Sequence, residues 1–183
     1  MTDSGNGTTI DVPNHGTPKA PNAYVLCYLT CPQDSSGAFV GALLLTDARG
    51  RPLHFGYVTP IKPTPFQRIL YGTALLEHVK VDVIAKKLFG GVPQVPDVVF
   101  VDSKDLLKSR RFISFPMAHL GKAEGGNESG GQLSALIYDT GENTHDRETV
   151  GILINCLENQ IDMLEPFRRM TEALKECLKP GGR

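Results

Sequence analysis

The sequence contains no long apolar run. None of its stretches reaches the roughly 20 consecutive apolar residues that a helix needs to cross a bilayer. Residues 1–23 are polar and contain Gly, Asn, Thr and Pro, without the apolar core segment of a signal peptide. We therefore expect neither a membrane anchor nor a membrane partner.

The sequence also has little net charge and few cysteines. Its 19 Lys and Arg residues nearly balance its 20 Asp and Glu residues. The whole protein therefore exerts no general attraction on polyanions, and any contact with nucleic acid has to be local. Four cysteines in 183 residues do not form the dense framework of a small secreted domain. The composition thus predicts reduced thiols and a cytoplasmic location.

Familiar metal and cofactor motifs are missing as well. The sequence has no HExxH motif, and the glycine-rich segment 121–131 has neither the Walker lysine spacing nor GxGxxG. Cys27 and Cys31 would stand on one face of a strand, but about 13 Å apart at about 3.3 Å per residue, which is too far for one metal ion. We interpret both as core thiols and expect no cofactor.

One short motif resembles a known catalytic signature. The sequence Asp139-Thr140-Gly141 resembles the Asp-Thr-Gly motif of aspartic proteases. Those enzymes need a second aspartate from another lobe or subunit, and β-structure continues after their motif. Here a long helical pattern follows instead, so we interpret the motif as a turn that ends a strand.

The chain has the organisation of one domain with short polar ends. Residues 1–21 contain turn formers and almost no periodic apolar residues, which predicts a disordered tail. Residues 22–179 are predicted to form a single α/β domain, and residues 180–183 a flexible C-terminus. The first strands of that domain are expected at residues 23–31, 38–46 and 53–59, where apolar segments alternate with turn signals. They would form a three-stranded antiparallel meander.

A helix with a clear start signal follows the meander. Thr64-Pro65-Phe66-Gln67 has the form of a capping box with proline at the first helical position. Apolar residues then recur at steps of three and four up to Val79, which predicts a helix packed on the sheet. Gly72 and the strand-like alternation at 79–83 predict a break, after which Asp82 is a candidate cap for a second helical piece.

The second half of the chain continues the α/β pattern. Residues 98–101 are apolar without alternation, which is typical of a strand buried on both faces, and this strand ends on Asp102. A short helix, a strand at 112–120 and a strand at 133–138 are expected next. A long C-terminal helical region begins near Asp146, and Pro166 should kink or divide it. The fold class is therefore α/β, with a buried strand in a mixed sheet and a long C-terminal helical region.

Three antiparallel strands, a helix and a buried strand ending in Asp resemble the ribonuclease H-like superfamily, and residues 59–102 resemble the corresponding part of endonuclease V. The resemblance implies acidic residues that bind Mg²⁺ or Mn²⁺ and activate water. Asp102 matches the acid that ends the fourth strand, Glu77 is a candidate for the middle position, and Asp34 is the first acid after strand one. That strand itself contains no acid, which departs from the superfamily's pattern.

Four basic residues form the densest positive group. Lys104, Lys108, Arg110 and Arg111 follow Asp102 directly. A nucleic-acid backbone could use such a group, but no aromatic residues are interleaved with it, so a solvated helix end is the simpler interpretation. Asp102 likewise has a simpler interpretation, as the cap of the short helix after it.

The sequence favours a binding function over a catalytic one. We expect a non-catalytic binding or scaffold subunit of a larger intracellular assembly, and an assembly that handles nucleic acid is one option. Its partner would be another protein subunit or a second copy of the chain. The alternative is a divalent-metal-dependent endonuclease of ribonuclease H-like type, with Asp102, Glu77 and Asp34 as its catalytic acids.

Overall fold

A six-stranded mixed sheet forms the centre of the computed structural model, which describes residues 23–122 and 136–179. The strands lie in the order β3-β2-β1-β4-β5-β6. Their bounds are β1 Val25–Thr30, β2 Phe39–Asp47, β3 Pro52–Ile61, β4 Val98–Val101, β5 Met117–Lys122 and β6 Leu136–Asp139. β1, β2 and β3 form the predicted antiparallel meander. β4 lies parallel to both β1 and β5, and β6 is antiparallel to β5. This order confirms the predicted α/β fold with a ribonuclease H-like mixed sheet.

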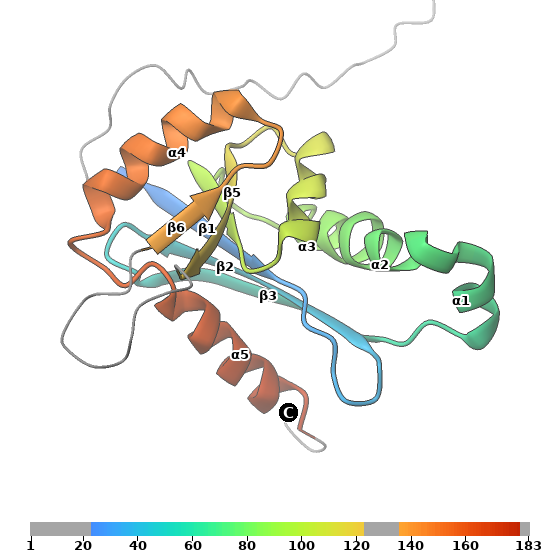
Figure 1. Ribbon diagram of the computed structural model, residues 1–183. Coiled ribbons are helices and arrows are strands. Elements are labelled where there is room, and N and C mark those ends of the chain that lie inside the picture. The colour runs from blue at the N-terminus through green and yellow to red at the C-terminus, as the bar shows by residue number, and fades with distance from the viewer. Residues whose placement is uncertain (1–22, 123–135, 180–183) are drawn as a thin grey trace, which may run out of the picture.

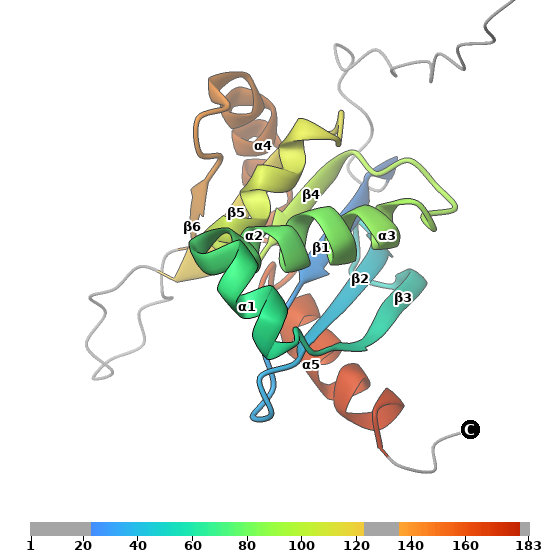
Figure 2. The same ribbon diagram turned by 90° about the vertical axis from the view of Figure 1, so that its right-hand side faces the viewer.

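Helices cover both faces of the sheet (Figures 1 and 2). Between β3 and β4 lie α1 Pro65–Tyr71, the 3₁₀ turn η2 Gly72–Ala74, α2 Leu75–Glu77, the π-helix η3 His78–Ala85 and α3 Lys86–Phe89. The 3₁₀-helix η4 Lys104–Arg111 follows β4, and α4 Thr144–Leu157 and α5 Glu165–Cys177 end the fold. α4 and α5 pack on one face, while α2, η3, α3 and η4 pack on the other.

Side chains alternate between the two apolar cores along the central strands. In β1, Leu26 and Tyr28 face α4 and α5, whereas Cys27 and Leu29 face η3. All four β4 residues are fully buried, as their unbroken apolar run predicted. The strand that begins at Met117 starts later than the expected residue 112, directly after a proline that cannot donate a ladder hydrogen bond.

The start of α1 is the predicted capping box. The Thr64 hydroxyl accepts the N–H of Gln67 at 3.2 Å, and the Gln67 side chain accepts the N–H of Thr64 at 2.9 Å. The expectation that this helical region packs on the sheet is confirmed for its second half, where Leu75 and Val79 are buried, but it is wrong for α1, which contains no buried residue. Figure 1 shows α1 projecting from the body of the protein at one end.

The predicted break lies at Gly72, and it turns the chain away from α1. Gly72 has φ +49°, a conformation that side-chain-bearing residues rarely adopt, and it ends α1. Asp82 does not cap a second helix, because it lies inside η3. η3 packs very closely on the sheet: a Cβ on Gly41 of β2 would come within 2.1 Å of the Ile84 side chain. Glycine at position 41 therefore permits this close packing.

Pro166 divides the C-terminal helical region, as expected. α4 ends at Leu157, and Pro166 stands in the first turn of α5, where its missing N–H costs nothing. The expectation that Asp146 caps α4 is wrong. The N-cap is Asn143, and Asp146 is a buried residue inside the helix.

Two predictions about the chain ends concern residues outside the described part. The expected tail at 1–21 and the expected flexible C-terminus at 180–183 both fall there. Within residues 23–122 and 136–179, no helix is both long enough and apolar enough to cross a membrane.

We expect Thr64→Ala to destabilise α1 locally by about 1 kcal/mol, because the substitution removes one half of the capping box. The melting temperature of the whole protein should change little, since α1 buries no side chain. Amide hydrogen exchange of residues 65–71 measures the effect. Unchanged exchange in α1 would contradict the role of the cap, and Thr64→Ser, which keeps a hydroxyl, is the matched control.

Candidate functional site

The predicted acid Asp102 lies where two parallel strands end at the same edge of the sheet. It follows β4 directly, and Thr30 is the last residue of the neighbouring β1. The Thr30 hydroxyl donates a hydrogen bond of 2.5 Å to the Asp102 carboxylate. Asp102 does not cap the next helix: the N-cap of η4 is Ser103, whose side chain makes no capping bond. The capping interpretation of Asp102 is therefore wrong.

The protein around the Asp102 carboxyl group changes its ionisation. Part of the residue is exposed to solvent, but the atoms packed around the carboxyl group desolvate it and raise its pKa. The hydrogen bond from Thr30 and the positive charge of Lys80 partly offset this rise. Burial also raises the pKa of the neighbouring Cys31 thiol to about 12, so this cysteine is not an activated nucleophile at neutral pH.

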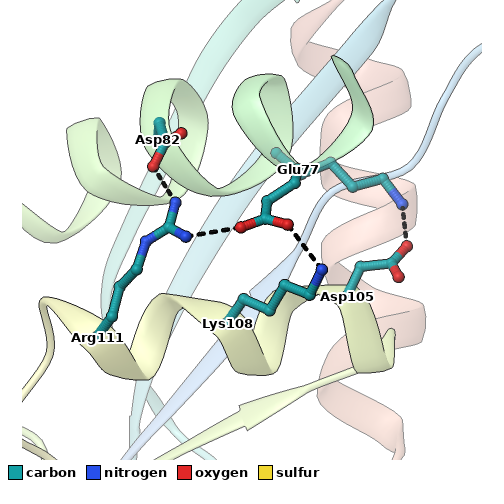
Figure 3. Close-up of polar contacts among 6 residues, drawn as sticks. Glu77, Asp82, Asp105, Lys108 and Arg111 are labelled. Atoms are coloured by element: carbon teal, nitrogen blue, oxygen red, sulfur yellow. Dashed lines mark hydrogen bonds and ion pairs between the residues drawn. The ribbon is translucent and has the colours of Figure 1, made fainter. Parts of the chain in front are cut away.

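The predicted acid Glu77 is held in an ion-pair network between two helical segments (Figure 3). Its carboxylate accepts hydrogen bonds from Lys108 and Arg111 of η4, each at 2.6 Å. These two bonds lower the pKa of Glu77 below its usual value. Arg111 also binds Asp82 of η3. Glu77 therefore joins α2 to η4 rather than facing a free site.

The third predicted acid, Asp34, caps its own turn. Its carboxylate accepts the backbone N–H of Ala38 at 2.9 Å and that of Ser36 at 2.8 Å. These hydrogen bonds, first of all the one from Ala38, lower the pKa of Asp34. Such a bonding pattern is typical of an aspartate that stabilises a turn between strands.

The structure does not bring the three predicted acids together. Among residues 23–122 and 136–179, no group of three His, Cys, Asp or Glu side chains is arranged to hold a metal ion. All three acids already bind other groups of the protein, and the partner of Asp102 is Thr30, on the strand that lacks an acid. These residues therefore do not fit the metal site that the family resemblance implied.

All four residues of the predicted basic group are paired with carboxylates. Lys104 contacts Asp139 at 2.8 Å, in the turn formed by the Asp-Thr-Gly motif, where Asp139 also accepts the N–H of Gly141. Lys108 and Arg111 bind Glu77, as described above. A phosphate backbone would have to compete with these pairs. The motif at 139–141 is the turn that its sequence context predicted.

Arg110 is the most buried member of this group and has a structural role. Its Nε and Nη2 bind the two carboxylate oxygens of Asp146 at 2.8 and 3.1 Å, and Nη1 binds the carbonyl oxygen of Ile113 at 2.6 Å. Asp146 is only 1% exposed and also accepts the N–H of Met117 at 3.1 Å. No sequence pattern indicates this pair, because the two residues are far apart in the chain.

A second candidate site is the apolar surface of α1, which we define as Phe66, Ile69 and Leu70. Ile69 and Leu70 follow Phe66 by three and four residues, about one helical turn, so the three side chains share one broad face. Their exposed fractions are 68%, 80% and 65%. Their spacing in the sequence predicted a position in the core. The signal against that assignment was Gly72, which separates them from the buried residues Leu75 and Val79.

We expect Arg110→Ala to destabilise the fold by about 3 kcal/mol, because it leaves the buried Asp146 carboxylate without its partner. Lys104→Ala, which removes an exposed ion pair, should cost under about 1 kcal/mol and is the matched control. Chemical denaturation measures both. Equal effects of the two variants would contradict the structural role of Arg110.

Asp102→Asn should stabilise the fold near neutral pH, because it removes a desolvated charge and keeps an acceptor for Thr30. The raised pKa means that Asp102 binds its proton more tightly in the folded protein than in the unfolded chain. Its contribution to stability therefore falls as the pH rises from the unfolded pKa through the folded pKa of this residue. The advantage of the variant should therefore disappear at acid pH. Melting temperatures of the wild type and the variant at neutral and at acid pH measure this effect. The same difference between the two proteins at both pH values would contradict the raised pKa of Asp102.

Comparisons with known proteins add a structural likeness and no family. No protein-family model matches the chain, and no curated protein sequence matches it. One similar solved structure is the Ciona intestinalis endonuclease V bound to a 23mer DNA containing an inosine. It matches with a TM-score of 0.39 and 9% identity over 60% of this chain, and the match spans only 50% of the endonuclease chain. This likeness is one of topology only.

Proposed function

We propose that the chain is a non-catalytic binding subunit of an intracellular assembly, and that it binds another protein through the apolar surface of α1. The observation that carries this proposal is the exposure of Phe66, Ile69 and Leu70 on one face of a helix with no buried residue. Large apolar side chains gathered on one exposed face mark protein-binding surfaces. An aromatic residue at such a position is a typical anchor.

The helix is formed before any partner binds. Its capping box satisfies backbone N–H groups at the start of the helix, and Pro65 fixes its first turn. A preformed helix costs little conformational entropy on binding, which increases affinity. The spacing of its apolar residues, at i, i+3 and i+4, suits a helix that inserts into an apolar groove.

The charges of this segment indicate the chemistry of that groove. α1 contains Arg68 and no acidic residue, and Lys62 precedes it. A partner groove with an acidic rim would complement these charges. We therefore infer a protein partner with an apolar groove bordered by Asp or Glu.

The structure supports a protein partner more strongly than nucleic acid or catalysis. The four basic residues after β4 are paired with carboxylates, which lowers their availability to phosphate groups. The three acids of the nuclease alternative do not converge in the described residues. No specific observation favours either of these functions.

A photoreactive amino acid tests the proposal in cells. We expect p-benzoyl-phenylalanine at position 66 to form an adduct with one protein partner, while the same amino acid at position 152 forms none. Ile152 is also exposed, at 54%, but it lies on α4 away from α1. The absence of any protein adduct at position 66 would overturn the proposal, as would adducts with lipid alone.

Charge variants then test the acidic rim with the purified partner. Ile69→Lys and Ile69→Glu both remove an apolar contact, and each should weaken binding at least about tenfold. The glutamate variant should bind more weakly than the lysine variant, because it faces acidic groups. Ile152→Glu is the control and should bind like the wild type. Equal binding of the lysine and glutamate variants would contradict the acidic rim.

A further inference from the structure

The edge strand β3 is long, uncharged and open on its outer side. It runs from Pro52 to Ile61 and contains no Asp, Glu, Lys or Arg. β3 is the last strand of its side of the sheet, and within the described residues no strand pairs with its outer edge. Natural proteins usually protect such an edge with charges, because its free N–H and C=O groups accept another strand. β3 lacks this protection.

The sequence of β3 is nearly symmetric about Gly56. Phe55 and Tyr57 flank this glycine, and Pro52 and Pro60 stand at equal distances on its two sides. The regular part of its pairing with β2 runs from residue 54 to residue 58 and has the same centre. Prolines cannot donate ladder hydrogen bonds, so they limit any further pairing to the segment between them.

We propose that β3 pairs antiparallel with β3 of a second copy of this chain, about a two-fold axis at Gly56. A two-fold contact needs a surface that is complementary to itself, with residue i meeting j and j meeting i. Centring on Gly56 gives the longest ladder without proline, and any shift of the register shortens it. In this register Phe55 lies opposite the partner's Tyr57, which is a favourable cross-strand aromatic pair.

Two observations favour a second copy as the occupant. The strand carries no charge, so pairing it with itself places no like charges opposite one another. Leu53 and Tyr57 are 49% and 44% exposed, and Tyr57 stacks on Phe55 with ring centroids 6.2 Å apart. Self-pairing would cover these apolar side chains on both copies at once. The two sheets would become one continuous sheet.

This inference does not depend on the proposed function of α1. α1 follows β3 directly in the chain, so antiparallel pairing places the two copies of α1 at opposite ends of the shared ladder. A dimer of this kind would present two binding helices. The dimer and the binding helix are tested by different variants and different measurements, so that failure of one leaves the other standing.

A single cysteine tests the register. We expect Gly56→Cys, in the full chain with Cys156→Ser and Cys177→Ser, to form a covalent dimer on mild oxidation or with a short bis-maleimide. A Cβ at position 56 has ordinary room, since its nearest neighbours would be the His54 side chain at 3.4 Å and the Leu88 side chain at 3.9 Å. Thr59→Cys in the same background is the control, because its two copies would lie about 20 Å apart at about 3.3 Å per residue.

Cross-linking at Gly56 and not at Thr59 supports the proposed register. Cross-linking at neither position, at Thr59 alone or equally at both would overturn it. Mass spectrometry of the cross-linked peptide identifies the disulfide. The two serine substitutions remove the exposed native thiols, and the remaining Cys27 and Cys31 are buried.

Sedimentation equilibrium tests the dimer itself. The wild-type chain should dimerise with rising concentration, and Leu53→Lys with Tyr57→Lys should raise the dimer Kd at least about tenfold by placing charges on the edge. Ile152→Lys is the control and should dimerise like the wild type. Both substituted residues of β3 are exposed, so circular dichroism and melting should stay close to wild type. A monomeric wild type, or a double variant that dimerises as before, would overturn the proposal.

Discussion

The ion pair between Arg110 and Asp146 holds together the segment that follows β4 and Asp102. It joins η4 to α4, and Asp146 also binds the N–H of Met117 at the start of β5. A buried carboxylate is stable only when its oxygens are paired, and here an arginine fork and a backbone N–H satisfy both of them. This pair fixes the position of η4. Because η4 is fixed, Lys108 and Arg111 meet Glu77 on the neighbouring helical segment.

As a result, two parts of the surface differ in their chemistry: charged side chains surround η4, whereas apolar side chains are exposed along β3 and α1. Around η4, acidic and basic side chains neutralise one another, which leaves little free charge for a metal ion or a phosphate backbone there. Along β3 and α1 the exposed groups are mostly apolar, and α1 has no buried residue. Apolar contacts are non-directional and scale with the area removed from water, so they suit protein association better than catalysis. The two surfaces for which we propose protein contacts therefore lie along β3 and α1 rather than around η4.

Local physics explains which features could be predicted from the sequence. The capping box at Thr64, the buried strand β4 and the division of the C-terminal helices at Pro166 depend on a few neighbouring residues, and the structure has all three. The Arg110–Asp146 pair and the partners of Glu77 depend on which elements meet in space. A basic residue next to a strand end looks the same in sequence whether it binds a phosphate or a buried carboxylate. The sequence therefore indicates which residues are candidate acids, but it does not indicate the groups that bind them in the structure.

The apolar periodicity of α1 is a second case in which a sequence pattern does not determine what a residue contacts. Phe66, Ile69 and Leu70 have the spacing of a core-facing helix, and nothing in that spacing distinguishes a helix packed on its own sheet from one available to a partner. The difference is made by Gly72, whose positive φ separates α1 from the segment that does pack on the sheet. The edge strand β3 ends only a few residues before α1 begins. One continuous stretch, residues 52–71, thus carries both an uncharged strand edge and an unburied apolar helix face. The surfaces of both proposals therefore belong to neighbouring elements of the chain.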